Sequence, residues 1–159
     1  MRRFATGVAI VTTTHEARIH GFTANAFASV SAEPPTVLIC VNRNARAHPL
    51  ISASQRFCVN VLALEQRALA EQFASGEPHT RFDGVAYRLG PSGSPILAGT
   101  LAHVDCTLGE ELTTGTHTIF LGQVIEAGHR EGAPLGYYDR RYRNFGAFDE
   151  LDEPPGPAR

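Results

Sequence analysis

The 159-residue sequence contains no lysine, and all 14 of its basic residues are arginine. A pyridoxal-phosphate enzyme needs a lysine for its Schiff base and a Walker-type P-loop needs one on the phosphates, so both classes are excluded. The sequence also lacks a glycine-rich dinucleotide fingerprint after a strand, a Gly-x-Ser-x-Gly nucleophile elbow and a His-Glu-x-x-His pair. If the protein is an enzyme, its difficult chemistry therefore belongs to a bound cofactor.

Cysteine, net charge and long apolar runs are also scarce. The three cysteines, Cys40, Cys58 and Cys106, lie far apart in apolar runs, which argues against a disulfide scaffold or a zinc site and predicts buried free thiols. A net charge of −2 gives no electrostatic reason to expect a nucleic-acid partner. No apolar run has the length of a membrane span and the first residues do not resemble a signal peptide, so we expect a cytoplasmic protein without a membrane partner.

The length fits one domain with a substantial core, over residues 1–148, followed by an acidic, proline-rich and disordered tail over 149–159. Apolar and β-branched runs predict many strands, and only two segments have helical character. We expect strands at 7–14, 19–23, 36–41, 57–62, 85–89, 102–108 and 118–125, helices at 47–54 and 64–75, and a loop at 90–95. The 36–41 run is continuously apolar, as in a strand covered on both faces, and Gly122 predicts a bulge or a close neighbour. This pattern favours a mainly β protein, an antiparallel barrel with a few short helices.

The segment Gly21–Pro35 combines small residues with several hydroxyls and one amide. Small side chains let a flat ligand approach the backbone closely, and the polar groups can orient it. The alternative reading from the residues alone is an ordinary strand-to-loop transition ended by Pro34 and Pro35.

Five segments, in this order, resemble the flavin reductase-like family, the small reductase components of two-component flavin-dependent monooxygenases. They are the opening Phe4–Thr12 run, the Gly21–Pro35 segment, the Phe57–Leu62 strand, Gly115-x-His117 before an apolar strand, and the Pro-Leu-x-Tyr-Tyr run from Pro134. The resemblance extends from Phe4 to Phe148. It implies a split β-barrel with Greek-key character, usually a homodimer, that uses NADH or NADPH to reduce FMN or FAD and releases reduced flavin to diffuse to a separate oxygenase.

The resemblance also implies site residues by position. The flavin ring and ribityl contacts correspond to Thr23, Ala24, Asn25 and Ala26, the next contact group to Ser29, Val30 and Ser31, and the strand end beyond the ring to Cys40, Val41 and Asn42. The family often has phosphate-binding hydroxyls where this chain has Asn44, Ala45, Arg46 and Ala47. We therefore expect the phosphate to be bound by backbone N–H groups, the Asn44 amide and Arg46, with a contribution from the Arg81–Phe82 pair.

The expected pyridine-nucleotide contacts are His117, Arg140 and Tyr142. The family often has Gly-Asp-His where this chain has Gly115-Thr116-His117, so we expect Thr116 to change nucleotide affinity without abolishing it. The residues alone leave other readings open: a structural histidine, and a solvated basic face at 140–143.

Two rival functions remain at this stage. One is an FMN-binding oxidase of the pyridoxamine-phosphate oxidase type, which needs a basic substrate-phosphate site. The other is a flavin-binding store or sensor without turnover, which the altered Gly-Thr-His segment keeps open.

Overall fold

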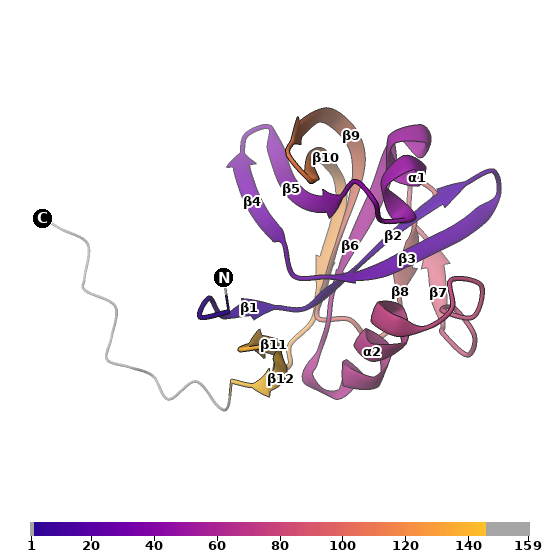
Figure 1. The fold of residues 1–159 in the computed structure, drawn as a ribbon. Coiled ribbons are helices and arrows are strands. Elements are labelled where there is room, and N and C mark those ends of the chain that lie inside the picture. Colours follow the sequence, from indigo (N-terminus) through magenta and orange to yellow (C-terminus); the bar gives the residue numbers. More distant parts are fainter. Residues whose placement is uncertain (1, 146–159) are drawn as a thin grey trace, which may run out of the picture.

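The computed structural model describes residues 2–145 and is mainly β, with two short α-helices and one turn of 3₁₀-helix (Figure 1). The strands are β1 Thr6–Gly7, β2 Ala9–His15, β3 Arg18–Ala24, β4 Phe27–Ala32, β5 Pro35–Asn42, β6 Arg56–Val61, β7 Tyr87–Leu89, β8 Pro95–Leu97, β9 Ala102–Thr114, β10 His117–His129, β11 Leu135–Tyr138 and β12 Arg141–Asn144. The helices are α1 Ala47–Ser54, the 3₁₀ turn η1 Leu64–Gln66, and α2 Arg67–Ser75. None of these helices is long and apolar enough to span a membrane.

Seven antiparallel strands form one sheet in the order β3-β2-β6-β9-β10-β5-β4. The edge strands β3 and β4 are consecutive in the chain and are joined by Asn25 and Ala26 alone. Because so short a connection holds the two edges together, the sheet must curl, and the Ala26 carbonyl accepts the Cys40 N–H at 3.1 Å across this corner. The result is a split barrel. Its topology has Greek-key character, because β2 pairs with β6 and β5 pairs with β10, strands that do not follow them directly in the chain. A second sheet, β1-β11-β12, and the β7–β8 hairpin complete the fold.

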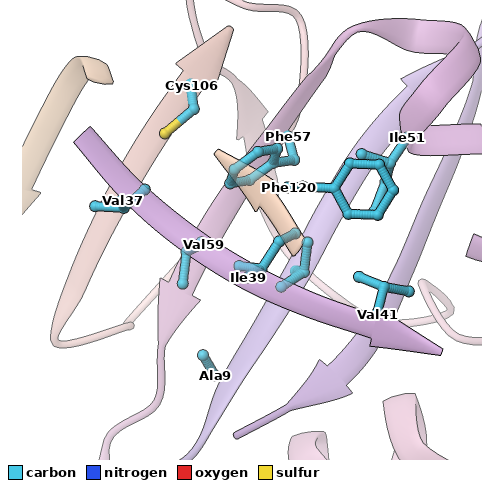
Figure 2. Packing of buried hydrophobic residues seen from close by; sticks show 10 residues of the cluster. Ala9, Val37, Ile39, Val41, Ile51, Phe57, Val59, Cys106 and Phe120 are labelled. Atoms are coloured by element: carbon cyan, nitrogen blue, oxygen red, sulfur yellow. The ribbon is translucent and has the colours of Figure 1, made fainter. Parts of the chain in front are cut away.

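The barrel interior is filled by alternate residues of its strands. Along β5, Val37, Ile39 and Val41 point inward and are buried, as period-2 alternation requires. They pack with Phe57 and Phe120, both without exposed surface, and with Ile51 from α1, which covers one end of the interior (Figure 2). A second apolar cluster joins α2 to the β1-β11-β12 sheet, through Val8, Ile10, Leu62, Ala70, Phe73, Leu97 and Leu135.

Each of the seven predicted strand regions contains a strand. The helix at 47–54 and the antiparallel barrel are confirmed. The strand-to-loop reading of 21–35 is wrong, because 27–32 pairs with β5 and forms β4. Full cover of 36–41 is also wrong in this structure, since Leu38 and Cys40 are only half-buried. The expected loop at 90–95 extends into β8 at Pro95, and β11 and β12 were not expected. The predicted tail at 149–159 lies outside the described residues.

Gly122 of β10 shows both features that its sequence position predicts. The β9–β10 register shifts between Leu121 and Gly122. A Cβ at Gly122 would lie 2.4 Å from Phe57 Cζ and 2.9 Å from Cys106 Cβ. The glycine therefore makes room for the fully buried Phe57 ring next to the register shift.

We predict that Gly122→Ala lowers the free energy of unfolding by about 1–3 kcal/mol, because a methyl group cannot fit against Phe57 without moving it. Urea unfolding followed by circular dichroism measures the change. Gly109→Ala is the matched control on the neighbouring strand, since its Cβ would meet only ordinary contacts at 3.4 Å and beyond. Equal stability of the two variants would contradict the packing argument.

Candidate functional site

Three hollows meet at the β3–β4 corner. Thr23 lines the first and the third hollow, and Ala24 and Asn25 line the second and the third. Their volumes are about 450, 650 and 200 Å³, and the first two fall within the range of small-molecule sites. The predicted ring-binding residues therefore lie where three connected spaces join.

The first space, here called the arginine hollow, lies between β3, the start of α1 and the end of α2. Its lining comprises His20, Gly21, Phe22, Thr23, Ala45, Arg46, Ala47, Leu50, Phe73, Ala74, Ser75, Gly76, Glu77, Pro78 and Arg81. Arg81 is held in place by donating to the Gly76 carbonyl at 2.9 Å and the Gly21 carbonyl at 2.8 Å. Partial burial and the nearby charge of Arg46 lower the pKa of Arg81, whose usual value is so high that it stays charged.

The arginine hollow is built to receive an anion. The Arg46 side chain has no hydrogen bond or ion pair in the part of the chain that the structure describes, and Glu77 is the single acidic residue in the lining. Helix α1 starts at this wall with no acidic residue in its first turn and no side-chain cap. Its Ala47 N–H is available to a ligand, whereas the His48 N–H donates to the Ala45 carbonyl at 3.0 Å and Pro49 has no N–H. Two guanidinium groups and a helix N-terminus together suit a phosphate or pyrophosphate group.

The second space, here called the apolar hollow, lies on the other side of the corner. Its lining comprises Phe4, Ala5, Thr6, Gly7, Val8, Ala9, Ala24, Asn25, Ala26, Phe27, Ala28, Leu38, Cys40 and Val61. Five alanines and one glycine keep its walls shallow, and its few polar groups include the Asn25 amide, which makes no hydrogen bond among residues 2–145. A flat aromatic system with one polar edge fits a space of this kind.

The third space, here called the tyrosine hollow, connects the corner to the small sheet. Val8, Thr23, Ala24, Asn25, Ala74, Tyr137 and Tyr142 line it. The rings of Tyr137 and Tyr142 pack edge to face with centroids 5.6 Å apart, and the Arg67 guanidinium lies 5.7 Å from the Tyr142 centroid. Burial, with Glu71 adding to it, raises the pKa of the Tyr142 phenol, which remains protonated and able to donate.

Nine of the predicted flavin contacts line these hollows. They are Thr23, Ala24, Asn25, Ala26, Cys40, Ala45, Arg46, Ala47 and Arg81, and Tyr142 from the pyridine-nucleotide set joins them. Thr23 contributes less polarity than its residue type suggests, since its hydroxyl donates to the Ala70 carbonyl at 2.6 Å. The site at the corner is therefore polar mainly through Asn25, Tyr142 and backbone groups.

The other predicted contacts lie outside the three hollows. Ser29, Val30 and Ser31 lie in β4, farther along the strand from the corner. The Ser31 hydroxyl forms hydrogen bonds with the backbone of Glu33 in the turn that follows. Val41 points into the core, and Phe82 packs against Phe73 with ring centroids 4.9 Å apart.

Asn42, Asn44, His117 and Arg140 occupy turns and strand ends. The Asn42 side chain accepts the Asn44 N–H at 2.8 Å in the turn before α1. His117 lies opposite Asn42 in the β5–β10 pairing, is exposed, and shares a 2.8 Å hydrogen bond with the Thr116 hydroxyl. Arg140 lies in the β11–β12 turn.

The sequence interpretation gave no site role to the N-terminal segment, Tyr137 or the end of α2. The N-terminal segment and Tyr137 lie within two of the segments that resemble the family, Phe4–Thr12 and the run from Pro134. That resemblance is the sequence signal that could have indicated a site role for them. The end of α2 carried no such signal, because only the tertiary fold brings Ser75–Pro78 beside α1.

A curled antiparallel barrel with a cationic and an apolar hollow at one corner is the architecture of the split-barrel flavin-binding proteins. The chain belongs to the flavin reductase-like domain family, whose model matches residues 1–146. It is 40% identical over 144 residues to FMN reductase (NADH) RutF of Stutzerimonas stutzeri, covering 89% of this chain and 83% of that protein. It is 41% identical over 141 residues to the reductase subunit HsaB of a flavin-dependent monooxygenase of Rhodococcus jostii, covering 88% and 72%.

A solved structure shares the fold closely. The NADH:FAD oxidoreductase SgcE6 of Streptomyces globisporus, in complex with NAD and FAD fragments, superposes with a TM-score of 0.88 at 39% identity, over 93% of this chain and 90% of that one.

We predict that Arg46→Gln weakens FMN binding by about tenfold, since a charge-assisted contact to phosphate at an exposed site is worth roughly 1.5 kcal/mol. Riboflavin, which lacks the phosphate, should bind both proteins equally. Titration of flavin fluorescence measures both affinities. Arg43→Gln, at an exposed arginine outside the arginine hollow, is the matched control, and an equal loss for FMN and riboflavin would contradict phosphate recognition by Arg46.

Proposed function

We propose that this protein is an NAD(P)H:flavin oxidoreductase that transfers hydride from NADH or NADPH to FMN or FAD and supplies reduced flavin to a separate monooxygenase. The observation that carries the proposal is the meeting of a cationic hollow and a shallow-walled apolar hollow at the β3–β4 corner. A flavin has the same division, with a phosphate end and a flat ring. Membership of the flavin reductase-like family and the names of the relatives support the same activity.

In this proposal the corner holds the flavin ring, and the arginine hollow holds its phosphate. Arg46, Arg81 and the Ala47 N–H at the start of α1 bind the phosphate, and Asn25 and backbone N–H groups face the polar edge of the ring. When bound, the flavin accepts hydride from the nicotinamide, a reaction that needs stacked rings and excluded water rather than a catalytic acid. The protein therefore acts by positioning two rings and needs no catalytic side chain.

The nicotinamide end is proposed to lie on the side of the tyrosine hollow. Tyr142 lines that hollow together with Thr23, Ala24 and Asn25, which supports its proximity to the flavin ring. His117 and Arg140 lie outside it and are proposed to contact more distant parts of the pyridine nucleotide.

The open face of the barrel supports the proposed homodimer. On the outside of β5, β10 and β9, Leu38 pairs with Leu121, and Ile119 pairs with Leu112. Leu112 is 61% exposed, and the others are only half-buried. Such a contiguous apolar sheet face suits a second copy of the chain. We place the dimer in the cytoplasm, with reduced flavin reaching the oxygenase by diffusion.

The proposed function is tested by mixing the purified protein with NADH or NADPH and, in turn, FMN or FAD, and following nucleotide absorbance. We expect flavin-dependent oxidation of the nucleotide. A protein that binds flavin but oxidises neither nucleotide would be a store or sensor. Oxidation of pyridoxamine phosphate with bound FMN, and no NAD(P)H oxidation, would indicate the oxidase alternative.

We predict that His117→Ala raises the KM for NADH by about 2- to 10-fold while flavin affinity is unchanged, because the substitution removes a single neutral hydrogen bond to the nucleotide. Steady-state kinetics and a flavin titration separate the two effects. His129→Ala, at the other end of β10, is the matched control. Unchanged kinetics in the His117 variant would leave this residue without a role in nucleotide binding.

We predict that Leu112→Glu converts the dimer to a monomer, because a carboxylate cannot be buried without a partner in an apolar interface. Light scattering coupled to size exclusion gives the molar mass, which should fall from twice the chain mass to once. Leu89→Glu, at a similarly exposed leucine on β7, is the control and should remain dimeric. A wild-type protein that elutes as a monomer would contradict the proposed assembly.

A further inference from the structure

The N-terminal segment forms one whole wall of the apolar hollow. Residues 4–9 line it on one side, and Asn25, Ala26, Leu38 and Cys40 line it on the other. The segment includes β1, which is paired with β11 through Thr6–Tyr137 and Gly7–Gly136, so the wall is fixed in place by the small sheet. Phe4 at the rim is 65% exposed, an unusual position for an aromatic ring.

Gly7 is the distinctive residue of this wall. A Cβ built on it would have no heavy atom within 4 Å, and its φ is not in the left-handed region. Of the other glycines in residues 2–145, those with equally open space, Gly84 and Gly115, have positive φ values that require glycine. Neither backbone conformation nor packing requires glycine at position 7, although glycine weakens a strand. The missing side chain leaves open space at Gly7, which is one of the residues that line the hollow.

Thr6, next to Gly7, carries an unused polar atom. Among the buried side-chain oxygen and nitrogen atoms of residues 2–145, the Thr6 Oγ1 is the one without a hydrogen-bond partner. A buried hydroxyl without a partner is unfavourable and calls for an explanation. Rotation about χ1 exchanges the positions of the hydroxyl and the methyl group of a threonine, so this hydroxyl can turn to a ligand that enters the hollow.

We propose that the flavin ring binds between the N-terminal segment and the β3–β4 corner, with the backbone of Gly7 against one face of the ring and the Thr6 hydroxyl hydrogen-bonded to its polar edge. The proposal rests on the flavin reductase function and assigns binding roles to two residues outside the corner. The flat wall at Gly7 accepts a fused aromatic ring, and the carbonyl and N–H groups along the pyrimidine edge can pair with a hydroxyl in either direction. Asn25 serves the same edge from the opposite wall.

A graded series at position 7 tests the wall. We expect Gly7→Ala to weaken FMN binding slightly and Gly7→Val to weaken it by about 10- to 100-fold, as added methyl groups fill the space of the ring. The melting temperature should not fall, because a Cβ at this position has no heavy atom within 4 Å apart from its chain neighbours and valine favours strands. Ala127→Val, which adds two methyl groups at an exposed position of β10, is the control.

Fluorescence titration with FMN, thermal unfolding and light scattering are measured on each variant. Unchanged FMN affinity in Gly7→Val overturns the proposal, as does a rise in the KM for NADH without loss of flavin affinity, which would assign the space to the nicotinamide. A change in molar mass with unchanged FMN affinity also overturns it, since the space would then belong to the partner subunit.

The hydroxyl is tested separately. We expect Thr6→Val to weaken FMN binding by about 2- to 10-fold and Thr6→Ser to retain the wild-type affinity, as one neutral hydrogen bond requires. Thr107→Val, at an exposed threonine of β9 outside the hollows, is the control. Equal affinities of the Val and Ser variants at position 6 overturn the role of the hydroxyl.

Cys40 supplies a readout of occupancy that needs no turnover. Burial, with nearby Asp105 adding to it, raises the pKa of Cys106 to about 12 and raises that of Cys58 as well, so both thiols stay protonated and inaccessible. Cys40 is only half-buried and lines the apolar hollow. FMN should therefore slow modification of Cys40 by a thiol reagent in the wild type and not in Gly7→Val at the same FMN concentration.

The outcomes separate this inference from the proposed function. Labelling of Cys40 that FMN does not slow, in a wild type that reduces FMN, overturns only the placement of the ring. A wild type that neither binds nor reduces flavin overturns the function and the inference together.

Discussion

The two-residue connection at the β3–β4 corner is the constraint on which the site depends. Asn25 and Ala26 join the two edges of a seven-stranded sheet, so the sheet cannot remain open and must curl until its edges meet. The hydrogen bond from the Cys40 N–H to the Ala26 carbonyl fixes this meeting point on β5. The edges approach only at the corner, and β3 and β4 are not hydrogen-bonded neighbours, so the barrel stays split beyond it. The three hollows adjoin this split, which makes the corner the natural place for a ligand.

Charge and shape are separated across the corner. On one side, Arg46, Arg81 and the uncapped start of α1 collect positive potential with a single acidic residue nearby. On the other side, mainly small and apolar residues from four separate parts of the chain leave a shallow-walled space. This separation suits a molecule with an anionic end and a flat aromatic end, and it explains how a chain without lysine and without a Gly-x-Ser-x-Gly nucleophile elbow can serve a redox reaction. The chemistry lies in the two rings, and the protein contributes their positions.

The polar residues of the Gly21–Pro35 segment show where residue types mislead. Hydroxyls at Thr23 and Ser31 suggest ligand contacts, but the first is bonded to the Ala70 carbonyl and the second to the backbone of its own turn. The segment supports the site mainly by its geometry, as the end of β3, the corner and the start of β4. Its free polar side chain near the hollows is Asn25. Its small residues Ala24, Ala26 and Ala28 line the apolar hollow.

Most local elements and the family resemblance can be derived from the sequence without the structure. Helix α1 and the barrel strands follow from apolar alternation and short-range signals, and ordered segments from Phe4 to the Tyr-Tyr run identify the flavin reductase-like fold. The set of residues that line the site depends on the tertiary fold. Phe4–Ala9, Leu38, Cys40 and Val61 come together from distant parts of the chain, and β11 pairs with β1 from the other end of the described chain. Burial and cavities are non-local, so no pattern within one segment can predict that Gly7 faces open space or that Val41 faces the core.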